Sequence, residues 1–218
     1  MLYNNFNEVD YMKRYCKYCQ YDFLDGDIIQ VKDNFILFNT DELIEYIYQI
    51  NDGYIKMVRY LESGDEKIIG ILGPGEYVAL LAVLQKKDNY LATAISLTPT
   101  LLKRITKKEV LNSYNKSPEF RDRCLTCAVS RSNTFQNNLV NSASIDTFER
   151  IINTLKALYE KFGYQENNQQ VIDLPFSKTV LANIIGIRRE TLSRSLKTLQ
   201  EREIVFFEKN KYILNYVI

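Results

Sequence analysis

The chain has no histidine and no tryptophan among its 218 residues. Histidine is the most frequent metal ligand and the usual general base at neutral pH. Its absence excludes serine-hydrolase triads and zinc-hydrolase sites of the usual kinds, and no phosphate-binding Walker loop is present either. We therefore expect a protein that is not an enzyme.

An excess of charge of one sign and long apolar runs are also lacking. The formal net charge is +1, so any positive charge that binds nucleic acid has to be local. No apolar run approaches the roughly 18 residues that cross a bilayer, and the N-terminal segment lacks the basic-then-apolar order of a secretory signal. We expect a cytoplasmic protein with no membrane partner.

Cysteine is scarce and occurs as two pairs, Cys16-x-x-Cys19 and Cys124-x-x-Cys127. In a cytoplasmic chain such pairs are more often free thiols, metal ligands or redox groups than structural disulfides. On a helix, Cys124 and Cys127 share a face, so they could hold a metal ion or part of an iron–sulfur cluster. Alternatively they are small apolar groups on that face, and Cys16 and Cys19 are two thiols of a flanking helix.

Residues 22–105 follow a pattern of short strands separated by turn residues. The candidate strands are rich in Ile, Tyr and Val and cover residues 28–31, 34–38, 45–50, 54–61, 67–72, 91–97 and 100–106. Asn-Asp-Gly at 51–53 and Ser-Gly-Asp at 63–65 lie between apolar runs, as hairpin turns do. Many short strands at this spacing predict a β-sandwich or barrel, with a short helix over residues 77–84 between two of the strands.

The next part is predicted to be helical, with a short helix over 107–113 and a long one over about 118–143. Ser117 suits the N-cap of the long helix, and Pro118 suits its first position. A narrow stripe recurs along it every three or four residues: Phe120, Cys124, Cys127, Ala128, Phe135, Leu139 and Ala143. A thin stripe on a long helix favours a seam against an identical helix, and therefore a two-fold dimer. We expect another helix over 147–162 and a polar loop over 163–170.

Residues 176–215 contain the pattern that carries most information on function. Ser177 can cap a short helix, and Gly186 can end it by adopting a positive φ angle. A second helix that begins near Arg188 turns three leucines, at positions 192, 196 and 199, to one face. Two short helices joined by a tight turn predict a helix-turn-helix, whose second helix can enter the major groove of DNA. Alternation over 204–207 and 212–214 predicts a two-stranded wing.

The second of these helices is cationic although the whole chain is not. Residues 188–202 contain five basic and two acidic side chains. Because Arg can pair with guanine and Glu can accept from the cytosine amino group, we assign base reading to Arg189, Glu190, Ser193 and Arg194. Contacts to phosphates, which position a protein without specifying sequence, are assigned to Ser177, Lys178, Arg188, Thr191, Lys197, Lys209 and Lys211. The alternative is a charged, solvated helix with no partner.

The segment RRETLSRSLKTLQEREIV closely resembles the recognition helix of the Crp/Fnr superfamily of transcription regulators, in which an Arg-Glu-Thr-x-x-Arg core reads DNA. Upstream, Asp-Gly-Asp at 25–27 looks like the opening turn of the family's β-roll. IGILGPGEY at 69–77 is similar to the phosphate-binding cassette of cyclic-nucleotide-binding domains. The resemblance implies a half-site that contains TGA and, for an activator, contact with RNA polymerase.

The resemblance also implies an α+β fold: an N-terminal β-roll (a cyclic-nucleotide-binding-like jelly roll) over 1–116, a dimerisation helix over 117–145 and a winged helix-turn-helix over 146–218. The cassette departs from the family at its ligand. Cyclic-AMP-binding members have an Arg-Ser pair where this chain has Tyr90 and Leu91, although Gly75 and Glu76 agree with the family. Since a buried phosphate without a guanidinium lacks its charged partner, we expect these four residues to mark an effector pocket that does not bind cyclic AMP. For Glu76 the alternative is a retained turn residue with no ligand, and we favour that alternative.

Two cofactors used within the family are considered. Cys16 and Cys19 resemble part of the cysteine set that holds an iron–sulfur cluster in the oxygen-sensing branch. Haem, bound by other members, would need Cys, Met or Tyr as its axial ligand here. The sequence therefore predicts a homodimeric regulator that binds palindromic double-stranded DNA and responds to a signal other than cyclic AMP, such as redox or nitrosative stress. The alternative is a small-molecule-binding module whose helix-turn-helix is vestigial or binds protein.

Overall fold

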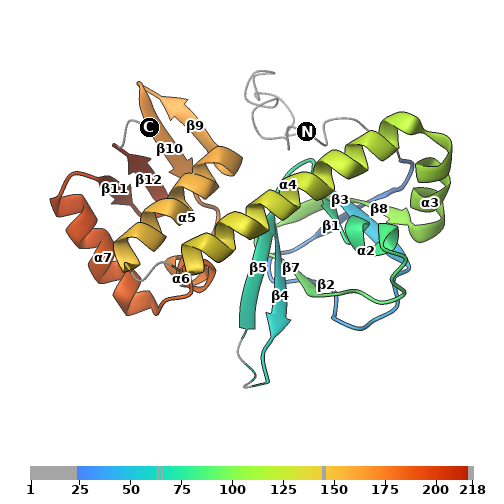
Figure 1. Cartoon of the computed structure of the whole chain (residues 1–218), viewed down its shortest axis with the longest axis horizontal. Coiled ribbons are helices and arrows are strands. Elements are labelled where there is room, and N and C mark those ends of the chain that lie inside the picture. Colours follow the sequence, from blue (N-terminus) through green and yellow to red (C-terminus); the bar gives the residue numbers. More distant parts are fainter. Residues whose placement is uncertain (1–23, 63, 65, 144–145, 216–218) are drawn as a thin grey trace. The chain divides into compact units, whose positions relative to one another are not determined.

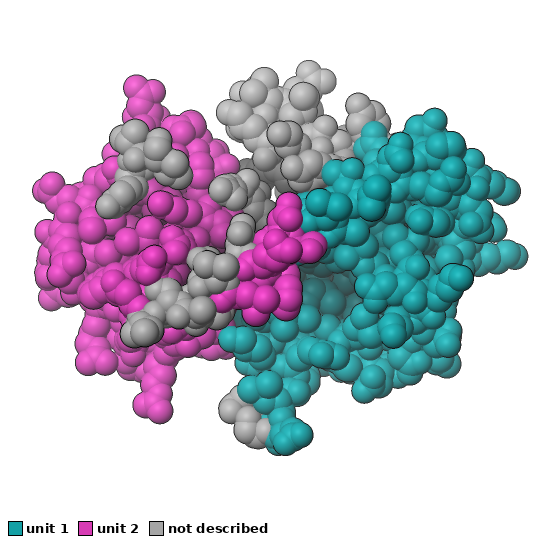
Figure 2. Space-filling model, in the orientation of Figure 1, with its two compact units in different colours: residues 1–131 teal, residues 132–218 magenta. Residues whose placement is uncertain are grey.

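The computed structural model describes residues 24–62, 64, 66–143 and 146–215. The chain divides into two compact units, a first unit of residues 1–131 and a second unit of residues 132–218 (Figure 2). One helix, α4 (Pro118–Ala143), contributes residues to both units. Among the described residues, no helix is both long enough and apolar enough to cross a membrane.

The first unit contains two four-stranded antiparallel sheets (Figure 1). The first sheet has the order β1-β8-β3-β6, formed by Asp27–Val31, Thr100–Thr106, Tyr46–Asp52 and Tyr77–Val78. The second has the order β2-β7-β4-β5, formed by Ile36–Phe38, Thr93–Ser96, Ile55–Tyr60 and Glu66–Leu72. Each sheet pairs strands from early and late parts of the segment. The predicted N-terminal β-roll is confirmed.

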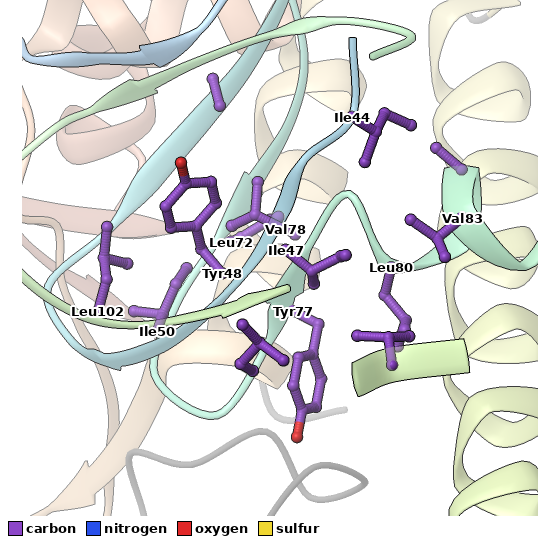
Figure 3. Packing of buried hydrophobic residues seen from close by; sticks show 14 of the residues in the cluster. Ile44, Ile47, Tyr48, Ile50, Leu72, Tyr77, Val78, Leu80, Val83 and Leu102 are labelled. Atoms are coloured by element: carbon purple, nitrogen blue, oxygen red, sulfur yellow. The ribbon is translucent and has the colours of Figure 1, made fainter. Parts of the chain in front are cut away.

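Aliphatic side chains from both sheets form the core of the first unit. Ile47, Ile50, Ile55, Leu102 and Ile105 have no exposed surface, and Figure 3 shows several of them packed together. Burying one such side chain stabilises the fold by about 1.5–3 kcal/mol. The β-branched and aromatic composition of the strands therefore provides both their local conformation and the contacts that hold the sheets together.

Two local predictions in this unit are wrong. Residues 51–53 do not form a hairpin, because β3 and β4 pair in different sheets; Gly53, with a φ of +88°, carries the chain from one sheet to the other. The helix predicted over 77–84 is shorter: Tyr77–Val78 pairs with β3 as β6, and α2 covers Leu80–Leu84 only. The strands on either side of the turn predicted at 63–65, β4 and β5, do pair with each other.

Two helices complete the first unit. Helix α3 (Lys107–Lys116) begins at Thr106, whose side chain accepts a hydrogen bond from the Glu109 amide. At the start of α4, Ser117 Oγ accepts from the Phe120 amide at 3.1 Å. The N-cap role predicted for Ser117 is therefore confirmed.

The stripe predicted along α4 has two different environments. Phe120, Cys124 and Cys127 are buried in the core of the first unit, and the Arg131 guanidinium donates to the Tyr77 carbonyl. The prediction that these three residues form a seam against another copy is wrong, since their own β-roll covers them. Another set of apolar side chains on α4 is exposed: Leu125 65%, Val129 51%, Phe135 62% and Leu139 54%. We call this set the exposed α4 stripe.

In the part that the structure describes, the second unit combines the end of α4 and three further helices with a four-stranded sheet of order β11-β12-β10-β9. Its elements in chain order are α5 (Thr147–Phe162), β9 (Gly163–Glu166), β10 (Gln169–Asp173), α6 (Lys178–Ile185), α7 (Arg189–Glu201), β11 (Val205–Glu208) and β12 (Lys211–Leu214). The polar loop predicted over 163–170 is wrong, because most of it forms the β9–β10 hairpin. Asn167 and Asn168 take the positive φ angles that its tight turn requires.

Apolar faces of the three helices meet over the sheet in the second unit. Ile151 and Leu155 of α5, Leu181 of α6 and Leu192 and Leu196 of α7 have no exposed surface. Helix α5 contacts both α6 and α7 as well as β10 (Figure 1). Its own start is fixed by Asp146, whose side chain accepts from the Phe148 amide at 2.8 Å. The predicted winged helix-turn-helix is confirmed.

Candidate nucleic-acid interface

The helix-turn-helix is shaped by two local signals. Ser177 caps α6, with its Oγ accepting from the Val180 amide at 3.4 Å. Gly186 ends α6 at φ +77° and ψ +39°, a left-handed conformation that Gly adopts with no Cβ penalty. Its amide and that of Ile187 both donate to the Ala182 carbonyl. Both signals were predicted from the sequence.

Helix α7 separates into a buried face and an exposed face. Leu192, Leu196 and Leu199 are buried beneath it, at the spacing of a helix with 3.6 residues per turn. All four residues assigned to base reading are exposed, with Arg189 in the first turn of the helix and the others on the side away from the leucines: Arg189, Glu190, Ser193 and Arg194. The sequence therefore builds a rigid helix whose solvent face carries two guanidinium groups and a carboxylate.

The residues assigned to phosphate contacts have more varied surroundings. Ser177, Arg188, Lys197 and Lys209 are exposed, and Thr191 is half-buried. Ser177 uses its hydroxyl as the cap of α6. Arg188 is the N-cap residue of α7 but makes no side-chain cap bond.

Two lysines of this set contact other protein groups. Lys178 Nζ lies 4.0 Å from the centroid of the Phe207 ring in the wing, and burial, then the charge of Arg189, lowers its pKa. Lys211 Nζ lies 2.6 Å from Glu166 Oε2, a partner that raises the pKa of Lys211. Both lysines can reach DNA only by leaving or sharing these contacts.

One residue of this interface was missed by the sequence reasoning. Arg150 lies on α5, yet its Nη2 donates to the Ile185 carbonyl at 2.6 Å and to the Gly186 carbonyl at 3.1 Å. These carbonyls belong to the end of α6 and to the turn before α7. Since Arg150 precedes them by 35 and 36 residues, no local pattern indicates the contact.

The residues predicted to mark an effector pocket have separate structural partners. Glu76 is buried and its Oε2 accepts from the Gly73 amide at 2.8 Å, so the carboxylate holds its own turn. Gly75 lies in this turn with a φ of +83°. Leu91 is exposed.

Tyr90 is the best-enclosed member of that set. Its ring stacks on Phe38 with centroids 3.6 Å apart, and its hydroxyl donates to the Tyr46 carbonyl at 2.7 Å. Burial raises its pKa above the usual value of a tyrosine. A neutral, hydrogen-bonded phenol therefore stands where the family pattern has a guanidinium.

The described cysteines do not fit a metal site. Cys124 and Cys127 are buried on one face of α4 and form no disulfide, and burial, then the neighbouring Cys127, raises the pKa of Cys124 to about 12. Metals bind thiolates, which this environment disfavours. Within the described residues, no three Cys, Asp or Glu side chains come together as a set of ligands. Cys16 and Cys19 lie outside the described residues.

Comparison with known proteins agrees with this architecture. Residues 28–117 match the family described as "Cyclic nucleotide-binding domain", and residues 149–216 match the "Crp-like helix-turn-helix domain". The global nitrogen regulator of Nostoc sp. is 26% identical over 179 residues, which are 82% of this chain and 80% of that protein. A CRP-like cAMP-activated global transcriptional regulator of Mycobacterium tuberculosis is 23% identical over 82% of this chain and 80% of that protein.

Among solved structures, FixK2 from Bradyrhizobium japonicum has a similar fold, with a TM-score of 0.78 and 16% identity over 88% of this chain and 94% of that one. A β-roll, a long helix and a winged helix-turn-helix with an exposed cationic helix define a DNA-binding transcription regulator with a cyclic-nucleotide-binding-like domain. The order of these parts and the relatives that share them identify the family. The chain belongs to the Crp/Fnr superfamily, whose matched relatives are transcription regulators and not enzymes.

Proposed function

We propose that this Crp/Fnr-type regulator acts as a homodimer that reads a palindromic site with two copies of α7. In each copy Arg189, Glu190, Ser193 and Arg194 would contact base edges. The observation that carries the proposal is that all four side chains are exposed while the leucines of α7 are buried. A helix held from beneath in this way can present its polar side chains to the major groove without rearranging.

The exposed α4 stripe supports the homodimer. Its four apolar side chains lie on one side of the helix, next to the face that is buried in the β-roll. More than half of the surface of each remains exposed in the single chain, and an identical helix about a two-fold axis would cover them. The proposal keeps α4 as the helix that pairs with its copy, as the sequence suggested. In the contact surface, Leu125 and Val129 take the place of the residues of the predicted stripe that are buried in the β-roll. We keep residues 1–116, 117–145 and 146–218 as the proposed sensor, dimerisation and DNA-binding parts.

The signal is proposed to be something other than cyclic AMP. The relative from M. tuberculosis is described as cAMP-activated and the one from Nostoc as a nitrogen regulator, so the family does not define one ligand. In this chain Tyr90 stacks on Phe38 and its hydroxyl is engaged by Tyr46. A cyclic phosphate brought to this position would meet the phenol of Tyr90 where the family pattern has a guanidinium. Titration with cyclic AMP should therefore release no measurable heat and leave DNA affinity unchanged.

The test of DNA reading is selection from a library of palindromic duplexes whose half-sites contain TGA. Arg189→Ala and Arg194→Ala should each lose most of the sequence preference, because a bidentate arginine discriminates a base by about 1–3 kcal/mol. Arg202→Ala removes an exposed arginine just beyond α7 and serves as the matched control. An unchanged selection profile in both α7 variants, with the fold intact, would contradict these roles.

A further inference from the structure

Arg150 is placed to control the recognition helix without belonging to it. It lies in the first turn of α5, where the next residue, Ile151, is fully buried and fixes the helix. From there the guanidinium reaches the end of α6 and donates from Nη2 to two successive carbonyls, those of Ile185 and Gly186. Its Nε is buried and has no hydrogen-bond partner among the described residues, and the residue as a whole is half-buried.

These two carbonyls stand at a sensitive point of the backbone. The last carbonyls of a helix have no partner within it and form the negative end of its dipole, so a cation is favoured there. Gly186 is left-handed, and glycine restricts its own torsions less than any other residue. Within the segment itself, the amides of Gly186 and Ile187 hold the turn between α6 and α7 through the Ala182 carbonyl. The contact from α5 restrains the same turn.

The direction of α7 follows from this turn. Helix α7 begins at Arg189, three residues after Gly186. A small change in the torsions of Gly186 would therefore displace Arg189. It would displace Arg194 by a larger distance, because Arg194 lies further along the helix. Base contacts depend on hydrogen-bond distances and angles, which tolerate only small displacements, whereas contacts to phosphates are less demanding.

We propose that Arg150 is a positioning residue for DNA reading: it holds the α6–α7 turn so that Arg189 and Arg194 meet base edges, and does not itself touch DNA. The proposal rests on the function proposed above. It predicts that loss of Arg150 reduces discrimination between DNA sequences and leaves the number of phosphate contacts unchanged.

The test compares Arg150→Met, which keeps an apolar stem and removes the donors, with Arg150→Lys, which keeps a cation. Arg202→Met is the matched control, because Arg202 lies over the Phe148 ring of α5 instead of the turn. Affinity for the selected site and for random duplex is measured at several salt concentrations, well below each variant's melting temperature. We expect Arg150→Met to lower specific affinity roughly tenfold, the scale of a lost charged hydrogen bond, with random-duplex affinity and salt slope unchanged. Arg150→Lys should recover part of the loss, and Arg202→Met should behave as the unaltered chain.

Two results would overturn the positioning role. If folded Arg150→Met keeps the ratio of specific to random affinity and only melts earlier, Arg150 merely stabilises the fold. If its salt slope falls by about one phosphate contact, Arg150 binds DNA directly. Failure of the proposed function is a different outcome, since the unaltered chain would then prefer no duplex sequence at all.

Discussion

Replacing Leu125 with alanine tests the surface through which two copies of the chain are proposed to pair. Leu125 lies on α4 beside the buried Cys124, yet 65% of its surface is exposed in the single chain. The substitution removes three carbon atoms from the exposed α4 stripe and touches no described core residue of either unit. Folding should therefore be unaffected, and the change should appear in self-association alone.

The magnitude follows from the exposed fraction. Complete burial of a leucine contributes about 1.5–3 kcal/mol, so covering two thirds of Leu125 contributes about 1–2 kcal/mol. A two-fold axis counts each substitution twice, which gives about 2–4 kcal/mol for the dimer, or a dissociation constant raised about 30- to 700-fold. Because alanine keeps its Cβ in the interface, we expect the lower end of this range.

Sedimentation equilibrium over a wide range of protein concentration measures the dissociation constant directly. Thr126→Ala is the control, since Thr126 is the exposed neighbour of Leu125 on another side of α4 and its hydroxyl donates within the helix, to the Asp122 carbonyl. Circular dichroism of both variants checks that they are folded. A dissociation constant that stays within a factor of two of the unaltered chain for Leu125→Ala would refute the stripe as the pairing surface.

Three further changes probe other features. Glu166→Gln frees Lys211 from its ion pair, so affinity for random duplex should rise by at most about fivefold, as for an exposed pair; anisotropy that shows no change would mean that Lys211 does not contact phosphate. Burial raises the pKa of Cys124 from 9.0 to about 12, so its protonated thiol contributes free energy of unfolding that is complete below about pH 9 and is lost as the pH rises toward 12. The free energy of unfolding in urea should therefore decline more steeply over this pH range for the unaltered chain than for Cys124→Ala, and parallel profiles would contradict this reasoning. Gly53→Ala should destabilise the first unit by more than about 1 kcal/mol, because the added Cβ would lie 2.7 Å from the Pro99 carbonyl oxygen, whereas Gly64→Ala, also at positive φ but with no atom within 4 Å, should cost less; equal melting temperatures for the two would be inconsistent with the clash.

Most of the DNA-binding part could be predicted because its signals are local. A serine at the N-cap and a glycine in the left-handed conformation act on their immediate neighbours, so α6 begins after Ser177 and ends before Gly186, as expected. The spacing of the leucines alone determined which face of α7 is exposed. Arg150 could not be found in this way, because its contact depends on how α5 packs against α6.

Predictions that required knowledge of the covering partner were less successful. Spacing along α4 showed that Phe120, Cys124 and Cys127 form one apolar face that has to be buried. It did not show that their own β-roll buries this face. The turn at 51–53 has hairpin composition, yet the pairing of β3 with β8 is determined by residues some fifty positions away. Residues 163–166 have no β-branched side chain and form a strand because β10 offers a partner. Tertiary context overrides local propensity in each case.

The sheet of the second unit has a consequence for the energetics of DNA recognition. An isolated two-stranded hairpin is at best marginally stable in water, and a segment that becomes ordered only on binding weakens its complex by the entropy it loses. Here β12 pairs with β10 from Gln170↔Leu214 to Asp173↔Lys211, so the two strands of the wing are one half of a continuous four-stranded sheet. If the wing contacts DNA as proposed, it would do so as an edge of a sheet that is already ordered, without this loss of entropy.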